Sequence, residues 1–217
     1  MERRTIDDEA WRRTVSLPAA FALVALAVAA CGGTDPEIGG VTSTVAGTLH
    51  ICEACHGRDG RSISPTFPRL AGQQKDYIVE QLKAFRDKTR ADPHARTYMW
   101  GPAARLSDPT IDAIAGYYAA HSPAAGEPDT SPEIAAGKTI FTDGIPSESV
   151  PACVACHGEH AEGNGPIPRL AGQHEDYLAR QLEAYASMER ANEIMREISK
   201  DMTAEQISEV SAYLATL

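Results

Sequence analysis

Apolar residues recur at helical spacing near the end of each half of the chain. One set falls within residues 108–120 and the other within residues 203–215, and each forms a single face of a predicted helix. The positions are Ile111, Ile114, Ala115 and Tyr118 in the first set, and Ile207, Val210 and Leu214 in the second. No stretch alternates apolar and polar residues as an amphipathic strand does. The pattern therefore predicts an all-α fold.

A longer sequence pattern occurs twice. Cys52-Glu-Ala-Cys-His-Gly57 recurs as Cys153-Val-Ala-Cys-His-Gly158, and Pro68-Arg-Leu-Ala-Gly-Gln73 recurs as Pro168-Arg-Leu-Ala-Gly-Gln173. In each copy Asp-Tyr and Gln-Leu pairs follow. Such extended self-similarity indicates two copies of one domain.

The same helical plan fits both copies. A helix leads into each cysteine pair (43–51 and 132–142), and another follows each Ala-Gly-Gln turn (74–88 and 174–190). The stretch 122–131 is rich in Pro, Gly and small residues and is predicted to be a linker. Ser131 and Pro132 then provide an N-cap and a first helical residue. We expect domains at 45–121 and 132–217.

The first thirty residues resemble an export signal. Arginines precede an uncharged apolar run over 17–30, which is shorter than the roughly 20 residues that span a bilayer. Val28-Ala-Ala-Cys31 resembles the lipobox of bacterial lipoproteins, which predicts cleavage before Cys31 and a lipid on that cysteine. An ordinary cleaved signal with a spare cysteine is the alternative. We favour lipidation because an idle thiol is a liability in an oxidising compartment.

Residues 31–44 are rich in Gly, Thr and Ser, and we expect a flexible tether. The predicted location is the periplasm, with a lipid anchor in a membrane. Gly32, directly after the lipidated position, favours the outer membrane if the cell is Gram-negative, by resemblance to lipoprotein sorting rules.

The negative charge is concentrated in the second half of the chain. Residues 31–126 contain ten acidic and ten basic side chains, whereas residues 127–217 contain sixteen acidic and six basic ones. Nucleic acid is therefore an improbable partner. An acidic half favours docking to a basic protein.

The two cysteine motifs indicate covalent haem. Two cysteines separated by two residues lie about one helical turn apart, and a histidine follows directly, so two thiols reach the vinyl groups of one haem while the imidazole meets the iron. A zinc site would join motifs 101 residues apart and leave both histidines without a role. A thioredoxin-like dithiol expects a strand-rich context.

We therefore predict two haem c groups. The thioether residues are Cys52 and Cys55 in the first copy and Cys153 and Cys156 in the second; the proximal iron ligands are His56 and His157.

With these motifs the chain resembles the class I cytochromes c, and most of all the di-haem cytochrome c4 family, over residues 45–217. The Cys-x-x-Cys-His, Pro-Arg-Leu-Ala-Gly-Gln and Met-before-Leu-Ser-Asp patterns carry the resemblance. It implies two haem domains that face each other and carry electrons between respiratory partners in the periplasm. It also implies that the carbonyl of Pro68 or Pro168 accepts a hydrogen bond from the ligating histidine, with Pro65 and Pro166 as nearby alternatives.

Counting suggests the sixth ligand of the first haem. Met99 is the only methionine between Cys55 and the linker, and it lies seven residues before Leu106. Of the histidines, His94 is close enough to remain a rival.

The second copy offers three methionines, Met188, Met195 and Met202. Aligning Tyr117 with Tyr213 places Met195 on Met99 and Met202 on Leu106, which predicts Met195 as the ligand and Met202 as a core residue. The other candidate histidines are His121, His160 and His174, and none recurs at an equivalent position.

Other repeated residues have structural interpretations. Gly47 and Gly137 are expected where the first helix of each domain crosses the last, so that Tyr117 or Tyr213 packs close to the backbone. For a further set we leave two interpretations open: contact with haem propionates or the interdomain face, or plain surface residues. The set is Arg69, Arg169, Tyr77 and Tyr177.

These features predict an electron carrier rather than an enzyme. Met/His ligation raises the reduction potential and fills both axial positions of the iron. We expect an upstream quinol-oxidising complex or dehydrogenase and a downstream terminal oxidase or reductase as partners. The alternatives are a fixed cytochrome subunit of a membrane-associated dehydrogenase complex and a di-haem peroxidase or thiosulfate-oxidising enzyme with an open iron ligand.

Overall fold

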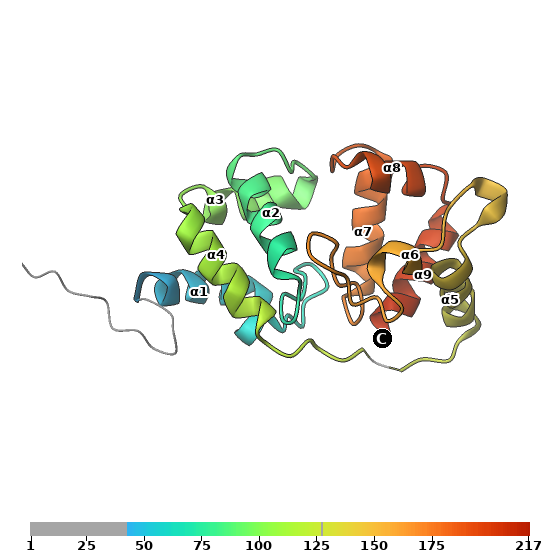
Figure 1. Ribbon diagram of the computed structural model, residues 1–217, viewed down its shortest axis with the longest axis horizontal. Coiled ribbons are helices and arrows are strands. Elements are labelled where there is room, and N and C mark those ends of the chain that lie inside the picture. The colour runs from blue at the N-terminus through green and yellow to red at the C-terminus, as the bar shows by residue number, and fades with distance from the viewer. Residues whose placement is uncertain (1–42, 127) are drawn as a thin grey trace, which may run out of the picture. The chain divides into compact units, whose positions relative to one another are not determined.

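The computed structural model describes residues 43–126 and 128–217, and this part of the chain is helical (Figure 1). Among these residues, strand-like pairing is limited to two isolated bridges, Ile145 with Val150 and Asn164 with Ile167. The predicted all-α class is therefore confirmed. The predicted signal, Cys31 and the tether up to residue 42 lie outside the described residues. Within the described part, no helix is long and apolar enough to span a bilayer.

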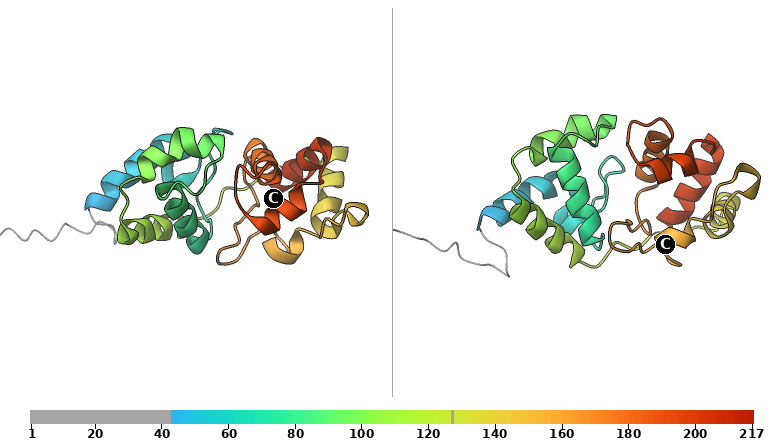
Figure 2. Two further views of the ribbon diagram at one scale, coloured as in Figure 1. Left: turned by 90° about the horizontal axis from the view of Figure 1, so that it is seen from above. Right: turned by 45° about the horizontal axis from the view of Figure 1, so that its top comes forward.

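Both copies of the repeat contain the three longer helices that the periodicity predicts. They are α1 (Ser43–His56), α2 (Lys75–Arg86) and α4 (Asp108–Ala119) in the first repeat, and α5 (Pro132–Asp143), α7 (Glu175–Ala186) and α9 (Ala204–Ala215) in the second. In each repeat the closing helix packs against the middle one, α4 against α2 and α9 against α7, and it also contacts the first helix, most extensively where α9 meets α5 (Figure 2).

Shorter helices lie between the longer ones. They are η1 (Arg58–Gly60), η2 (Ala95–Met99) and α3 (Trp100–Ala103) in the first repeat, and η3 (Pro146–Glu148), α6 (Val154–His157) and α8 (Glu193–Ser199) in the second. Of these, η2 is a π-helix, a wide turn often found at functional sites.

Each repeat has its own hydrophobic core. In the first, Ile111 and Tyr118 on α4 are fully buried and pack in one cluster with Ile78 and Leu82 of α2. In the second, the cluster joins residues of α5, α7 and α9, namely Phe141, Leu178, Val210 and Leu214. The predicted apolar faces of the two closing helices are therefore confirmed.

Capping residues fix where the closing helices begin. The Ser107 hydroxyl accepts the Thr110 N–H at the start of α4, and Thr203 forms a capping box with Gln206 at the start of α9. Ser131 occupies the predicted N-cap position of α5, but its side chain makes no capping hydrogen bond.

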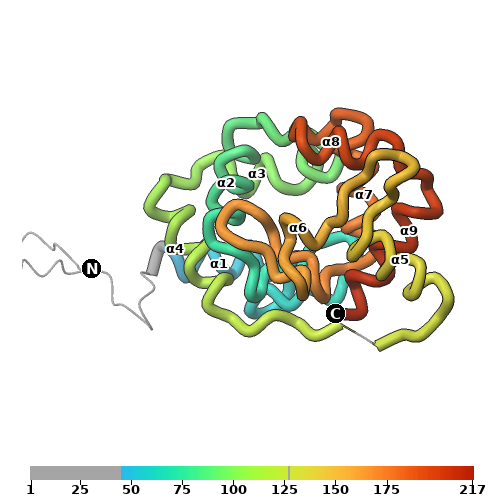
Figure 3. Tube along the Cα trace, turned by 45° about the vertical axis from the view of Figure 1, so that its right-hand side comes forward, coloured from blue at the N-terminus to red at the C-terminus, as the bar shows by residue number. Residues whose placement is uncertain are grey.

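The second cysteine motif lies largely on its own short helix, because the preceding helix ends close to residue 142 as predicted, whereas the first motif belongs to a helix that extends beyond the predicted 43–51. Whereas α1 is continuous through the first motif, α5 ends at Asp143 and α6 begins only at Val154 (Figure 3). Gly144 has a positive φ of 74° and lies against the Val150 carbonyl, where a side chain would collide. This turn ends the helix before the motif.

The two helix-crossing glycines behave differently. A Cβ on Gly137 would collide with the Glu209 carbonyl and approach Tyr213 of α9, so Gly137 permits the predicted close crossing. A Cβ on Gly47 would meet nothing within 4 Å. The prediction is therefore confirmed for Gly137 and wrong for Gly47.

This difference predicts opposite effects of the same substitution. Gly137→Ala should destabilise the haem-loaded protein by about 1–3 kcal/mol because α5 and α9 must separate. Gly47→Ala, in the interior of α1, should be neutral or stabilising by up to about 1 kcal/mol because alanine favours a helix. Thermal unfolding followed by circular dichroism measures both. Equal melting temperatures of the two variants would contradict the assigned crossing.

Candidate cofactor-binding sites

In the first repeat, α1 carries the cysteine motif on its last turn. Cys52 is partly buried, Cys55 is exposed and His56 is buried. Both cysteines are free of disulfides. Their spacing of three residues puts the two thiols about one helical turn apart, with the imidazole directly beyond them.

One hydrogen bond sets the chemistry of His56. Its Nδ1 lies 2.9 Å from the carbonyl oxygen of Pro68. A carbonyl oxygen only accepts, so Nδ1 must carry the hydrogen and Nε2 keeps its lone pair. Burial lowers the pKa of His56, which favours the neutral, metal-binding form.

The second repeat reproduces this arrangement. Nδ1 of His157 donates to the Pro168 carbonyl over 3.1 Å, and burial lowers the pKa of this imidazole too. The contacts involve Pro68 and Pro168 rather than Pro65 and Pro166, which confirms the implied acceptors. Such a partner orients a ligating histidine and raises its basicity.

The cysteines nearest the cores are held as neutral thiols. Burial raises the pKa of Cys52, and it raises the pKa of Cys153 to about 11. Among the described residues, no group of three His, Cys, Asp or Glu side chains converges as a metal site. The two motifs thus remain separate, each with two thiols and one imidazole, and this donor set fits covalent haem.

The methionines occupy different environments. Met99 ends η2 and packs against the first core, while Met195 lies partly buried in the first turn of α8. Met202 packs against the second core as Leu106 packs against the first, which confirms its predicted core role. Met188 is 48% exposed. The assignments of Met99 and Met195 as iron ligands stay predictions.

Three of the four candidate histidines have contacts of their own. His94 stacks on Tyr98 at 5.7 Å between ring centroids, and His121 Nδ1 lies 2.7 Å from the Tyr117 carbonyl. His174 Nε2 donates to the Ser62 carbonyl over 2.9 Å. His160 is exposed.

The two repeats also contact each other through reciprocal hydrogen bonds. The amide of buried Gln173 accepts the Arg69 N–H at 2.8 Å and donates to the Arg69 carbonyl at 3.0 Å. Gln73 does the same for Arg169, at 2.7 and 2.9 Å. The side-chain amide of each glutamine thus pairs with both the backbone N–H and the backbone carbonyl of one arginine in the other repeat.

The four repeated residues for which two interpretations were left open, haem or interdomain contact and plain surface, lie at this contact; they are Arg69, Arg169, Tyr77 and Tyr177. The Arg69 guanidinium donates to the Gly172 carbonyl, and the Tyr77 and Tyr177 hydroxyls accept from Arg190 and Arg90 respectively. With the Arg169 backbone bonds, these contacts support the interdomain interpretation.

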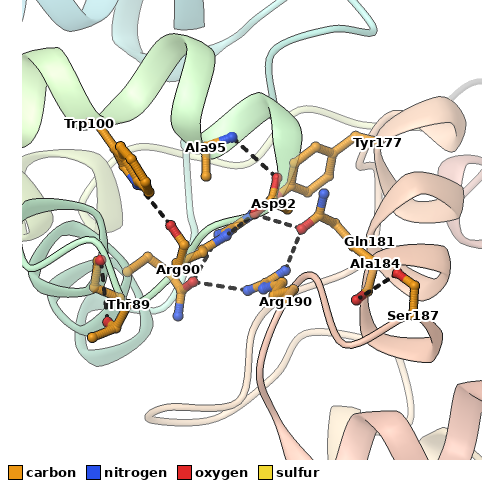
Figure 4. A network of polar contacts seen from close by, with 12 residues as sticks. Thr89, Arg90, Asp92, Ala95, Trp100, Tyr177, Gln181, Ala184, Ser187 and Arg190 are labelled. Carbon is orange, nitrogen blue, oxygen red and sulfur yellow. Dashed lines mark hydrogen bonds and ion pairs between the residues drawn. The ribbon is translucent and has the colours of Figure 1, made fainter.

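Sequence reasoning missed several residues at the contact. Gln73 and Gln173 were part of the repeated motif but had no assigned role, and the same holds for the repeated Gln-Leu pairs. Two buried arginines, Arg90 and Arg190, join them (Figure 4). These glutamines and arginines recur at a constant offset of 100 residues in the two copies, and this recurrence was the one feature of the sequence that could have indicated their role.

Comparison with known proteins agrees with the geometry. Residues 134–217 match the family model described as Cytochrome c. Cytochrome c-552 of Acidithiobacillus ferridurans is 42% identical over 168 residues, which cover 76% of this chain and 73% of that protein. The solved structure of cytochrome c4 from Acidithiobacillus ferrooxidans, also 42% identical, superposes with a TM-score of 0.73 over 76% of this chain and 98% of that one.

A further relative has a more specific name. The thiosulfate dehydrogenase electron acceptor of Stutzerimonas stutzeri is 34% identical over 181 residues, which cover 76% of this chain and 77% of that protein.

The partly buried position of His174 between the repeats predicts that their association is acid-sensitive. Burial, and then the nearby Arg69 and Arg180, lower the pKa of His174 and outweigh the opposite effects of the hydrogen bond to Ser62 and of Asp176. A lowered pKa in the folded state means that the stabilisation is present above the ordinary value of about 6.5 and is lost as pH falls through the lowered value.

We expect His174→Gln to remove this pH dependence, because Gln74 occupies the equivalent position and donates to the Glu162 carbonyl over 2.8 Å. Melting temperatures of the two proteins should agree near neutral pH and diverge below about pH 6, with the parent less stable. Parallel profiles at all pH values would rule out His174 as the titrating group.

Proposed function

The chain belongs to the di-haem cytochrome c4 family, and from this premise we propose that it carries single electrons between respiratory partners in the periplasm while a lipid on Cys31 holds it at a membrane. As a member of the family it is an electron carrier with two haem c groups. The lipid anchor and the location rest on the leader sequence and the cysteine that ends it. In a Gram-negative cell, Gly32 favours the outer membrane.

In each repeat the proposed donor set is two thiols, one imidazole and one thioether. Cys52, Cys55, His56 and Met99 would hold the first haem, and Cys153, Cys156, His157 and Met195 the second. The observation that carries the proposal is the buried histidine of each repeat, whose Nδ1 is committed to a prolyl carbonyl and whose Nε2 remains free for iron.

The bound group supplies a one-electron iron couple. The protein's part is to fix its environment: the prolyl carbonyl orients the imidazole, and a thioether ligand favours the reduced metal. In each repeat a histidine and a methionine would both bind the iron, so the metal would have no open position for a substrate. This arrangement suits electron transfer without bond making.

A second candidate role is the cytochrome subunit of a dehydrogenase complex. The similarity to a thiosulfate dehydrogenase electron acceptor favours it. The redox partners would then be a fixed dehydrogenase upstream and a terminal oxidase or reductase downstream. Purification of the tagged chain from its native membrane discriminates the two roles, since a fixed subunit retains a stoichiometric dehydrogenase and a shuttle does not.

The ligand assignment predicts distinct spectra for methionine variants. The ferric protein, matured with two covalent haems, should show the weak far-red band of Met ligation. Met99→Leu and Met195→Leu should each remove about half of this band, because each changes one of two sites. Met202→Leu, which alters a core methionine, is the matched control and should retain the full band.

A full band in Met195→Leu would make the second assignment wrong. One haem, or a high-spin centre in the parent protein, would contradict the proposed carrier and favour an enzyme with an open ligand.

The acidic second half predicts salt-dependent association. The rate of electron transfer to a basic redox protein should fall as ionic strength rises from about 0.01 M to about 1 M, since the Debye length shortens from about 30 Å to about 3 Å. Stopped-flow mixing measures this rate. An acidic acceptor serves as the control and should show the opposite trend; a rate to the basic protein that is indifferent to salt would contradict the docking model.

A further inference from the structure

Two arginines and two glutamines form a nearly symmetric network where the repeats meet (Figure 4). Arg90 donates to the side-chain oxygens of Gln81 and Gln181, at 2.8 and 2.6 Å. Arg190 donates to the same two oxygens, at 2.9 and 2.7 Å. Each glutamine oxygen therefore accepts from one arginine of each repeat.

The network is shielded from solvent. Arg90 is 7% exposed and Arg190 is 5% exposed. Their guanidinium groups lie over the rings of Phe85 and Tyr185, at 4.7 and 4.6 Å from the centroids. Water and salt screen such buried charges far less than they screen charges on the surface.

The charges of the two repeats differ at one position of this network. Asp92, whose side chain is 3% exposed, accepts from Arg90 Nε at 3.0 Å. The equivalent residue of the second repeat in the sequence is Asn192, which is uncharged and exposed, and among the described residues no carboxylate lies within 4.0 Å of Arg190. The network thus holds two cations and one anion.

The environment of Tyr77 reflects this excess of positive charge. Burial raises the pKa of this hydroxyl, but Arg190 and Arg90 outweigh burial, so that the pKa is lowered. The Tyr77 hydroxyl accepts from Arg190 at 2.9 Å. A neutral phenol and two amide oxygens do not cancel the arginine's charge.

The asymmetric position is joined to the segment that carries each proposed axial methionine. Asp92 Oδ1 accepts the N–H of Ala95, the first residue of η2, and η2 ends at Met99. Asn192 Oδ1 accepts the N–H of Met195 itself, at 2.9 Å. Asp92 is therefore bonded to the segment that carries the proposed ligand of the first haem, and Asn192 to the segment that carries the proposed ligand of the second.

We propose that Asp92, through this buried arginine network, lowers the reduction potential of the haem in the first repeat relative to that of the second. The inference rests on the proposed ligands of the two haems. A buried negative charge stabilises ferric over ferrous iron, and burial is one of the means by which a protein tunes haem. Asp92 is a positioning residue for charge, because it touches the network and not the iron.

Two isosteric substitutions test the proposal. Asp92→Asn removes the buried carboxylate, Asn192→Asp adds an exposed carboxylate at the N-cap of α8, and both keep the Oδ1 acceptor that caps the ligand segment. Spectroelectrochemical titration of the di-haem protein gives two midpoint potentials for each variant.

The mean of the two potentials should rise in Asp92→Asn and fall in Asn192→Asp. Their separation should nevertheless change in the same direction in both variants, because one raises the first potential and the other lowers the second. The double variant, which removes the buried carboxylate of the first repeat and adds an exposed one to the second, should show the largest change in separation, with the larger part from Asp92→Asn.

Asp112→Asn is the control, because it removes an exposed carboxylate of the first repeat that pairs with Lys75 at the surface. Shifts no larger than those of the control, or equal shifts of both potentials in each variant, would overturn the inference. The far-red band is recorded in parallel. Its absence from the parent protein would instead overturn the proposed ligands, so the two failures are distinguishable.

Discussion

A histidine can bind iron only if one ring nitrogen keeps its lone pair, and in both repeats a prolyl carbonyl imposes that condition. The carbonyls of Pro68 and Pro168 cannot donate, so they fix the hydrogen on Nδ1 of His56 and His157. Burial then disfavours the protonated imidazolium. The cysteines, the surrounding helices and the loops that hold the prolines are all arranged around this one tautomer.

The loop that presents each proline is closed in the same way. In the first repeat the N–H groups of Leu70 and Ala71 both donate to the Gly60 carbonyl, and in the second the equivalent groups donate to Ala161. Gly60 has a φ of 78°, and Ala161 adopts the same left-handed region at 52° without being glycine. An alanine there costs about 1 kcal/mol or more, so the loop geometry outweighs the local preference of the residue.

Sequence periodicity was sufficient to predict the longer helices, because the buried residues of each lie on one face; the structure adds that Ser107 and Thr203 cap the two closing helices. Periodicity was insufficient for η2 and α8, whose short lengths depend on tertiary contacts rather than on helix propensity. The extension of α1 through the first motif was also missed, whereas α5 ends close to its predicted bound, where Gly144 with its positive φ terminates the helix.

The contact between the repeats was the least predictable part. Arginine and glutamine are usually surface residues, so nothing in their local pattern indicates burial. Arg90 and Arg190 become buried only because each finds acceptors in the other repeat. Such a partnership is a property of the folded chain, and recurrence of the residues in both copies is its only trace in the sequence.

The two methionines proposed as ligands lie at different distances along the chain from the buried arginines, but at the same distance from the closing helix. Arg90 and Arg190 align at an offset of 100, whereas Ser107 and Thr203 align at 96, so the second repeat has four fewer residues in between. Four residues are close to one helical turn, so their loss shortens a helix but leaves the remaining residues near the same face. Counted from the cap of the closing helix, Met99 and Met195 therefore occupy the same position. Counted from the arginines, they lie one turn apart, and the proposed ligands follow the closing helix.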